Sequence, residues 1–268
     1  AGNEIPEPLA AKAAVRRALR EQGADKVHQP HTLPDHIRQL FPSRFQFTEE
    51  LGWIPEGWLE TQVKDLASII KGKSYKSSEL QDSKTALVTL KSFNRGGGYR
   101  LDGLKEYTGK YKPEQEVYAG DLIVAYTDVT QAADVIGKPA MVVSDNRYEH
   151  LVISLDVGVV RPNQENYRYF LYGTAQTDRF QDHTRSFTTG TTVLHLAKDA
   201  VPGYTLADPG EVLVDRFAQV VQPLYKAIDK NVANGRVLQS LRDNLLPKLL
   251  SGELRIPEAE KALDEALA

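Results

Sequence analysis

Residues 208–250 read DPGEVLVDRFAQVVQPLYKAIDKNVANGRVLQSLRDNLLPKLL, and this stretch dominates the organisation of the chain. Asp208 and Pro209 are typical of a helix start, because an aspartate side chain caps free N–H groups and proline is tolerated at the first helical position. The pattern of the apolar residues predicts a coiled-coil-like helix from about residue 208 to 250. These residues recur at steps of three and four, the spacing of one helix face: Phe217, Val221, Leu224, Ile228, Leu238, Leu241, Leu245 and Leu249.

The predicted helix is too long for one small domain to cover. At ~1.5 Å per residue it would reach roughly 60 Å, whereas a domain of roughly 130–150 residues has a radius of gyration of only ~14–15 Å. The heptad is interrupted at Gly235, where two successive steps of three lead to Leu238 and Leu241. The apolar face either packs on the helix's own domain, as most such faces do, or contacts another chain. The length favours a contact outside the domain for at least part of the helix.

The composition is that of an ordinary globular protein of 268 residues, with 41% hydrophobic and 26% charged residues. No apolar stretch approaches the ~20 residues of a membrane-spanning helix, and no signal-peptide pattern opens the sequence. The absence of cysteine excludes disulfides and fits a cytoplasmic location, which we expect. Because the first residue is Ala1 rather than Met, we also expect a fragment or a trimmed chain.

The charge is unevenly distributed along the chain. A net charge of −3 argues against a free-standing protein that binds nucleic acid regardless of sequence. Residues 61–110 nevertheless hold ten Lys and Arg against five Asp and Glu, whereas residues 205–268 hold eight against ten. The basic excess therefore lies before the long helix, and the acidic excess lies in residues 205–268, which contain it.

Residues 1–50 differ in character from the rest of the sequence. They predict short helices at Leu9–Gln22, which stops at Gly23, and at His36–Phe41, which Pro42 terminates. His28, His31 and His36 suggest a metal site. Without cysteine or a nearby pair of carboxylates, exposed loop histidines are the favoured interpretation, and we predict no metal.

Residues 51–204 predict an α+β domain, because strands come first and helices later without regular alternation. Tyr167–Ala175 fits either a strand or a helix. The other expected elements are a helix at Val63–Ile70 and strands at Thr85–Phe93, Asp121–Tyr126, Ala140–Ser144 and Leu151–Val160, separated by turns at Gly120, Gly137–Pro139 and Asp145–Asn146.

Catalytic motifs are missing from the sequence. Gly72-Lys73-Ser74 resembles part of a phosphate-binding loop, but the required earlier glycine is Ala67 and no strand precedes it. Gly96-Gly97-Gly98 lacks the spacing of a dinucleotide-binding loop. The sequence also lacks the Asn/Asp-Pro-Pro-Tyr/Phe motif of adenine methyltransferases, a nuclease-like carboxylate cluster and a nucleophile elbow. We therefore predict no catalytic residues.

Several loops combine donors, aromatic residues and small residues, a mixture suited to groove edges and phosphates. Solvated surface is the alternative for any single member, because loops are polar in general. We expect Arg95 and Asn94 to read bases and Lys73 and Lys76 to meet phosphates. The DNA-binding candidates are Lys73, Ser74, Tyr75 and Lys76 in a first loop (residues 71–78); Ser92, Asn94, Arg95, Tyr99 and Arg100 in a second (91–100); Gln181, His183 and Arg185 in a third (179–189); and, as a weaker fourth group, Thr127, Asp128 and Gln131.

Four segments resemble the specificity (S) subunit of Type I restriction–modification systems. Residues 238–256, LQSLRDNLLPKLLSGELRI, are similar to the C-terminal signature of that family. Residues 52–58, GWIPEGW, are similar to the motif that opens a target recognition domain. Residues 71–105, KGKSYKSSELQDSKTALVTLKSFNRGGGYRLDGLK, and 190–196, GTTVLHL, resemble one class of this domain. These segments are distributed over most of the length of residues 50–257.

The resemblance implies a linker at 1–50, a target recognition domain at 51–204 and a long spacer helix followed by a short C-terminal helix at 205–268. It favours a helix at 167–175. It also implies that the chain recognises double-stranded DNA, that methylation and cleavage belong to separate M and R subunits, and that S-adenosylmethionine binds the M subunit, with no cofactor here. A second S half, or a second copy, would pair through the helix. The partner-interface candidates are Leu224, Ile228, Leu238, Leu241, Leu245 and Leu249.

Two other functions remain open from the sequence. One is a stand-alone methyltransferase or nuclease, against which the missing motifs argue. The other is a coiled-coil adaptor, which leaves the basic, glycine-rich loops without a role. Binding of S-adenosylmethionine by the isolated chain would favour the enzyme, because the S-subunit interpretation predicts none.

Overall fold

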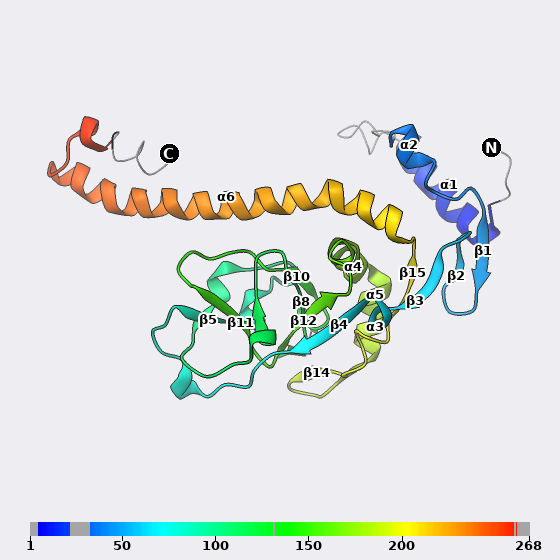
Figure 1. Cartoon of the computed structure of the whole chain (residues 1–268), viewed down its shortest axis with the longest axis horizontal. Coiled ribbons are helices and arrows are strands. Elements are labelled where there is room, and N and C mark those ends of the chain that lie inside the picture. Colours follow the sequence, from blue (N-terminus) through cyan, green and yellow to red (C-terminus); the bar gives the residue numbers. More distant parts are fainter. Residues whose placement is uncertain (1–4, 22–32, 131, 260, 262–268) are drawn as a thin grey trace.

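The computed structural model describes residues 5–21, 33–130, 132–259 and 261. It confirms the predicted α+β class: sheets of mostly antiparallel strands form a central domain, and one long helix runs along it (Figure 1). The helices are α1 (Glu7–Glu21), α2 (Asp35–Arg38), α3 (Val63–Leu66), α4 (Tyr167–Ala175), α5 (Asp178–Ser186) and α6 (Glu211–Ser251).

Two four-stranded sheets make up most of the central domain. The first has the order β10 (Pro139–Met141), β8 (Leu122–Ala125), β12 (Val157–Pro162), β4 (Ala67–Lys71). The second has the order β6 (Lys105–Glu106), β5 (Thr85–Val88), β11 (His150–Ile153), β7 (Glu116–Val117). Smaller sheets join β13 (Thr188–Thr189), β14 (Leu194–Leu196) and β9 (Thr127–Asp128); β15 (Thr205–Asp208) and β3 (Leu59–Gln62); and β1 (Phe45–Thr48) and β2 (Gly52–Pro55).

Strand β8 shows why the first sheet lies in the middle of the domain. Its four residues are all buried, and successive side chains of a strand point to opposite faces. Leu122 and Val124 pack with α4, α5 and the start of α6, whereas Ile123 and Ala125 pack toward the second sheet. Because both faces are covered, the strand is apolar throughout.

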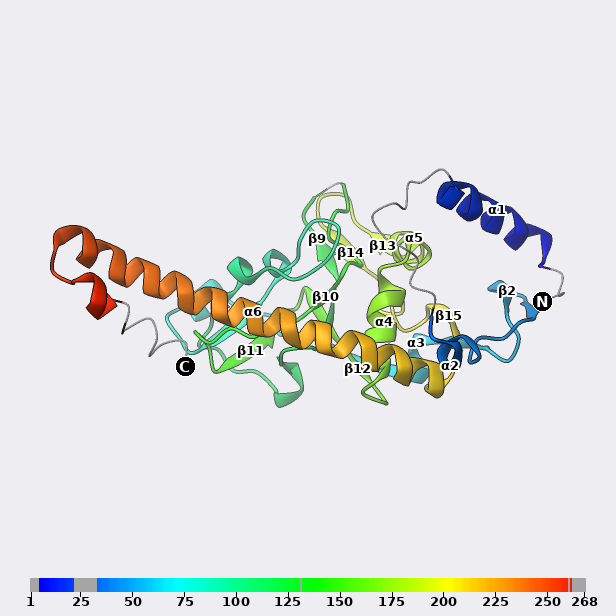
Figure 2. The same ribbon diagram turned by 90° about the horizontal axis from the view of Figure 1, so that it is seen from above.

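Helix α6 docks on the domain at its N-terminal end. Val214 and Ala218 are buried in the core on the helical side of the first sheet. Tyr225 stacks on Tyr169 of α4 with ring centroids 5.8 Å apart and meets the edge of Tyr172 at 5.7 Å. The C-terminal part of the helix continues past the sheets, as the side and top views show (Figures 1 and 2). The expectation that one domain cannot cover the helix is confirmed.

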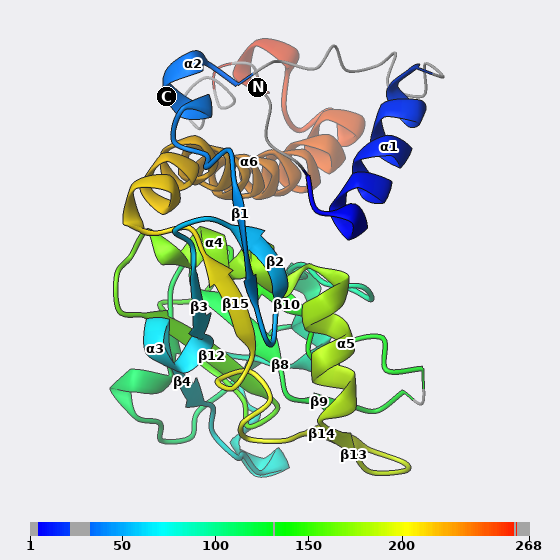
Figure 3. The ribbon, with the colours of Figure 1, turned by 90° about the vertical axis from the view of Figure 1, so that its right-hand side faces the viewer.

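The predicted cap of α6 is wrong. Asp208 ends strand β15, which pairs with β3, and the N-cap is Gly210 at a φ of 85°. The Asp208 carboxylate accepts hydrogen bonds from the Gly210 N–H at 3.0 Å and the Tyr167 hydroxyl at 3.1 Å. The aspartate therefore organises the turn before the helix rather than its first turn. Figure 3 shows β15 beside β3 beneath the start of α6.

Helix α6 ends at Ser251, and Gly252 is its C-cap. Gly252 adopts the left-handed conformation, with a φ of 74°, and its N–H donates to the carbonyl of Leu249. A helical turn follows at 256–259, and Ala259 in it is buried. The short C-terminal helix is therefore described only in part, because residues 260 and 262–268 lie outside the described residues.

One predicted helix and one predicted strand change type part-way. Residues 67–71 are strand β4 rather than helix, because β-branched Ile69 and Ile70 pair with β12. The strand expected at 85–93 stops at Val88. The Thr89 hydroxyl then accepts from the Lys91 N–H and starts a 3-10 turn at Leu90–Ser92. Further 3-10 turns are at Ser77–Glu79, Leu101–Gly103 and Pro113–Gln115.

The strand predicted at 151–160 is two strands in two different sheets. A turn at 154–156 separates β11 from β12, and the Val157 N–H donates to the Ser154 carbonyl at 2.9 Å. Leu155 projects outward at this turn, so the apolar run concealed the break. The strand expected at 140–144 is also shorter, ending at Met141, whereas the helix at 167–175 is confirmed with its predicted bounds.

Residues 178–186 form helix α5, which corrects the prediction of a loop at 179–189. Thr177 is its N-cap, and the Thr177 hydroxyl accepts from the Phe180 N–H at 3.3 Å.

We expect Thr177→Ala to lower the free energy of unfolding by about 1 kcal/mol, because one N–H at the helix start loses its partner. Urea unfolding followed by circular dichroism measures this. Ser186→Ala, at the exposed end of the same helix, is the control. An unchanged midpoint in Thr177→Ala would contradict the capping role.

No helix in the described part of the chain is long and apolar enough to cross a membrane. Within the same residues, no group of three or more His, Asp or Glu is arranged to hold a metal ion. His36 lies in α2, whereas His28 and His31 lie outside the described residues.

Candidate nucleic-acid interface

The second, third and fourth candidate segments lie together on one side of the domain. The Gly96 N–H donates to the Asp134 carbonyl at 3.1 Å, and the Gly98 N–H donates to the Pro139 carbonyl at 2.9 Å. From α5, the Gln181 side-chain amide donates to the Gly137 carbonyl at 3.0 Å. Segments far apart in sequence therefore form one surface around residues 134–139.

Three cations lie on this surface, and we call Arg95, Lys138 and Arg185 the basic cluster. The Arg95 side chain is 82% exposed, and its Nε lies 3.7 Å from an Asp134 carboxylate oxygen. Burial, together with the positive charge of Arg185, lowers the pKa of Lys138, although the carboxylates of Asp178 and Asp134 partly oppose this. We did not predict Lys138 as a site residue, because the sequence Gly137-Lys138-Pro139 predicts a turn.

Asp128 shapes the loop that supplies Asp134. Its buried carboxylate accepts backbone hydrogen bonds from Thr130 and Val135, both at 2.7 Å, and from Ile136 at 3.1 Å. Burial alone would raise the pKa of Asp128, but these hydrogen bonds outweigh it and the pKa is lowered. Asp128 therefore positions the loop rather than projecting from it. Gln131 lies outside the described residues.

Several predicted site residues belong to the interior instead. Ser92, Thr127 and Gln181 are buried, which corrects the expectation that they project from loops. Ser92 Oγ accepts from the Thr89 N–H, and Thr127 Oγ1 donates to Asp156 at 2.5 Å. His183 Nε2 lies 2.8 Å from the Ala200 carbonyl oxygen. Polarity in these segments reflects internal hydrogen bonding.

The side chains of the second loop face in two different directions. Arg95 faces outward, whereas the Tyr99 hydroxyl is buried, which raises the pKa of Tyr99, near Arg236 of α6. The Asn94 amide donates to the Tyr99 carbonyl at 3.4 Å, and Arg100 pairs with Asp102 at 2.5 Å. Only the first half of the loop is therefore directed to the basic cluster.

The first loop contacts a different part of the domain. The Lys73 N–H donates to the Ile153 carbonyl at 2.8 Å, and the Lys105 ammonium lies 5.4 Å from the Tyr75 ring centroid. Ser74 and Lys76 are exposed. These contacts attach the loop to the second sheet, away from residues 134–139.

Helix α6 carries two apolar faces rather than one. Val221, which we assigned to the seam, packs against the domain core together with Tyr225. The outward face, which we call the outer stripe, consists of exposed apolar side chains at helical spacing: Phe217, Val220, Leu224, Ile228 and Leu238. Beyond it, Leu241, Leu245 and Leu249 are half-buried.

Comparisons with known proteins agree with this arrangement. The chain matches no protein-family model. It is 38% identical over 69 residues to the specificity subunit of the Type I restriction enzyme MjaIX of Methanocaldococcus jannaschii, a match that covers 26% of this chain and 16% of that protein. In fold it is similar to a Type I restriction–modification S subunit from M. genitalium, with a TM-score of 0.50 and 11% identity over 73% of this chain and 46% of the other.

The chain resembles Type I specificity subunits in sequence and in fold. The resemblance inferred from the motifs is therefore confirmed. An HsdS subunit from Thermoanaerobacter tengcongensis also matches, with a TM-score of 0.43 and 14% identity over 92% of this chain and 56% of that chain. The chain covers less than two thirds of each of these specificity subunits.

Proposed function

We propose that this chain is the sequence-specific DNA recognition component of a Type I restriction–modification complex. It reads one half of a bipartite double-stranded site and positions the M and R subunits. The observation that carries the proposal is the presence of two unlike surfaces. The second loop, the turn at Gly137–Pro139 and helix α5 supply the basic cluster on the domain, and the outer stripe of α6 remains uncovered by the domain. A subunit that joins DNA to partner proteins needs both surfaces.

The basic cluster supplies groups suited to DNA. The exposed Arg95 guanidinium can contact a guanine edge through two donors, which is a sequence-specific contact. Lys138 and Arg185 lie near each other on the same surface, as charges suited to the flanking phosphates. Ser74 and Lys76 of the first loop are exposed at a separate place and would add phosphate contacts.

The outer stripe would bind either a second S half or a second copy of this chain, and the M subunits would hold the assembled helices. In this proposal the chain is not catalytic and carries no cofactor, and S-adenosylmethionine binds the M subunit. A stand-alone methyltransferase is the competing function. Calorimetric titration of the isolated chain with S-adenosylmethionine distinguishes the two, because micromolar binding would refute the specificity-subunit role.

We expect the isolated chain to bind duplex DNA weakly and with a steep dependence on salt. Its net charge is −3, so binding must come from a few Lys and Arg that release counterions. With about four phosphate contacts, the slope of log K against log salt would be roughly −3.6. Fluorescence anisotropy from 50 to 200 mM salt, with and without the M subunit, measures this. Tight, salt-independent binding by the chain alone would contradict the proposal.

A further inference from the structure

The segment after β10 is attached to α6 at two points. The Ser144 N–H donates to an Asp229 carboxylate oxygen at 2.7 Å, and the Asp145 carboxylate pairs with the Arg236 guanidinium. Asp229 and Arg236 are seven residues apart, so they lie about two turns and ~10 Å apart on the same helix face. We call these four residues, together with Arg147, the joint.

The joint is centred on a buried charge. The Asp145 side chain has 0% exposure and accepts from Arg147 Nε at 3.0 Å and Nη2 at 2.8 Å, in addition to its pair with Arg236. A buried carboxylate is stable only while its partners stay in place. The hydrogen bonds of Arg147 to Asp145 and of the Ser144 N–H to Asp229 are charge-assisted and directional. Arg236 adds an ion pair to the same buried carboxylate.

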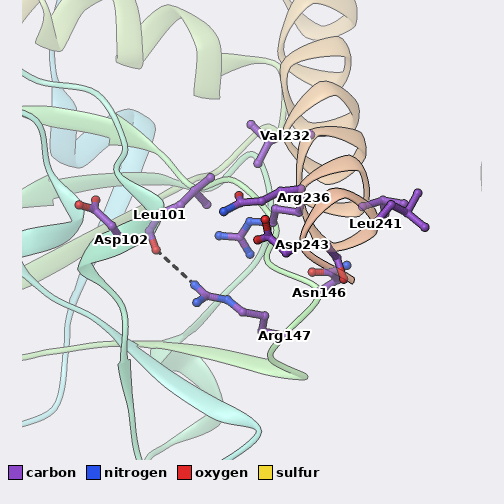
Figure 4. Close-up of a pocket in the computed structure, with 12 residues that line it drawn as sticks. Leu101, Asp102, Asn146, Arg147, Val232, Arg236, Leu241 and Asp243 are labelled. Atoms are coloured by element: carbon purple, nitrogen blue, oxygen red, sulfur yellow. Dashed lines mark hydrogen bonds between the residues drawn. The ribbon is translucent and has the colours of Figure 1, made fainter. Parts of the chain in front are cut away.

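The joint also reaches the loop that carries Arg95. Arg147 Nη2 lies 3.5 Å from the Leu101 carbonyl oxygen, just after the second loop, and Arg236 lies beside the buried Tyr99 hydroxyl. Figure 4 shows Arg236 extending from α6 toward the domain, with Arg147 bonded to the Leu101 segment. Helix, joint and second loop are therefore connected through the side chains of Asp145, Arg147 and Arg236.

The contact at the start of α6 is one of two places where the helix is attached to the domain. It combines apolar side chains, among them Val214 and Ala218, with a hydrogen bond from the Asn166 side-chain amide to the Asp215 carboxylate. Arg236 lies 22 residues after Val214, roughly 33 Å further along the helix at ~1.5 Å per residue. A second contact at that distance restricts pivoting of the helix about its N-terminal end.

We propose that the joint, and Arg236 in particular, sets the orientation of the recognition domain on α6 and so determines which separation of the two DNA half-sites the assembled complex accepts. This inference rests on the proposed function. Arg236 and Asp145 act as positioning residues that need not touch DNA. Their loss should change spacing preference, not the ability to methylate.

The test uses the complex assembled with its M subunit and DNA that carries the mapped site with the spacer between the half-sites shortened, unchanged or lengthened by one base pair. For Arg236→Met and Asp145→Asn, we expect the methylation rate on altered spacers, relative to the natural one, to rise by about 2- to 30-fold. Arg236→Lys keeps the positive charge but lacks the planar guanidinium group. It should give an intermediate rise in the relative methylation rate on altered spacers. Hydrogen exchange of the isolated chain should show faster exchange at the Ser144 amide, with β8 still protected.

Arg216→Met is the matched control, because this exposed arginine of α6 donates to Gln219 and has no part in the joint. It should keep the spacer preference of the parent. Parent-like spacer preference in Arg236→Met and Asp145→Asn, or an equal loss on all three spacers, would overturn the inference. A parent complex that methylates no bipartite site would instead refute the proposed function, so the two failures are distinguishable.

Discussion

Replacing Leu224 and Ile228 together by aspartate should lower the affinity of this chain for its helical partner by at least ~100-fold while leaving it folded. Both side chains are exposed, at 58% and 46%, so the domain does not need them. Burying each in an interface contributes about 1.5–3 kcal/mol, and every 1.4 kcal/mol changes a dissociation constant tenfold. The substituted carboxylates would also have to be desolvated.

Sedimentation equilibrium of the chain alone, and titration with the M subunit, measure the two possible associations. Lys226→Asp adds a charge to an exposed site on another side of α6 and is the control. The thermal unfolding midpoint should be unchanged in both variants. If the double variant associates as tightly as the parent with both partners, the outer stripe is not an interface.

The choice between the two apolar faces of α6 could not be made from the sequence. Val220 and Val221 are adjacent, and spacing alone assigns either one to a stripe that includes Leu224 and Ile228. The structure separates them, because Val221 packs with Tyr225 on the domain whereas Val220 faces outward. A heptad pattern identifies an apolar helix, but only tertiary packing decides which side is already covered.

The bounds of helix α4 could be predicted, but its type followed from the family resemblance, because the residue pattern fits either a strand or a helix; α5 was not predicted. In α4 the buried residues are mostly aromatic or aliphatic, which is compatible with both types of element. In α5 only Phe180, Gln181 and Thr184 are buried, and two of these are polar. A polar helix that buries hydrogen-bonded side chains has no apolar stripe, so it resembles a loop. Because the sequence of α5 resembles a loop, we predicted Gln181 and His183 as surface groups.

The joint illustrates a further limit of sequence interpretation. Asp145-Asn146 predicted a turn, and the turn is present, but nothing near it in sequence indicates partners 85 and 91 residues away in α6. The contact exists because the segment between β10 and β11 passes close to the helix. Isolated charges such as Arg236 on a long helix are usually solvated. Their pairing with a buried carboxylate is visible only in three dimensions.

Arg95→Ala should lower methylation of the cognate half-site by about 5- to 150-fold and relax the preference at one base pair, because a bidentate arginine–guanine contact is worth ~1–3 kcal/mol of discrimination. The side chain is exposed and its Nε is 3.7 Å from Asp134, so this weak surface pair can open to release the guanidinium. The glycines at 96–98 hold this loop against residues 134–139, which fixes where the arginine projects.

The assay is methylation by the assembled complex of a panel in which each base pair of the mapped half-site is varied singly. Lys76→Ala is the comparison, because Lys76 is exposed in the first loop and is expected to meet phosphate. It should weaken binding about equally across the panel and reduce the salt slope by ~1. A uniform loss in Arg95→Ala, or parent-like activity on every member, would remove the base-reading role of the second loop and leave Arg95 as one more phosphate contact or a solvated side chain.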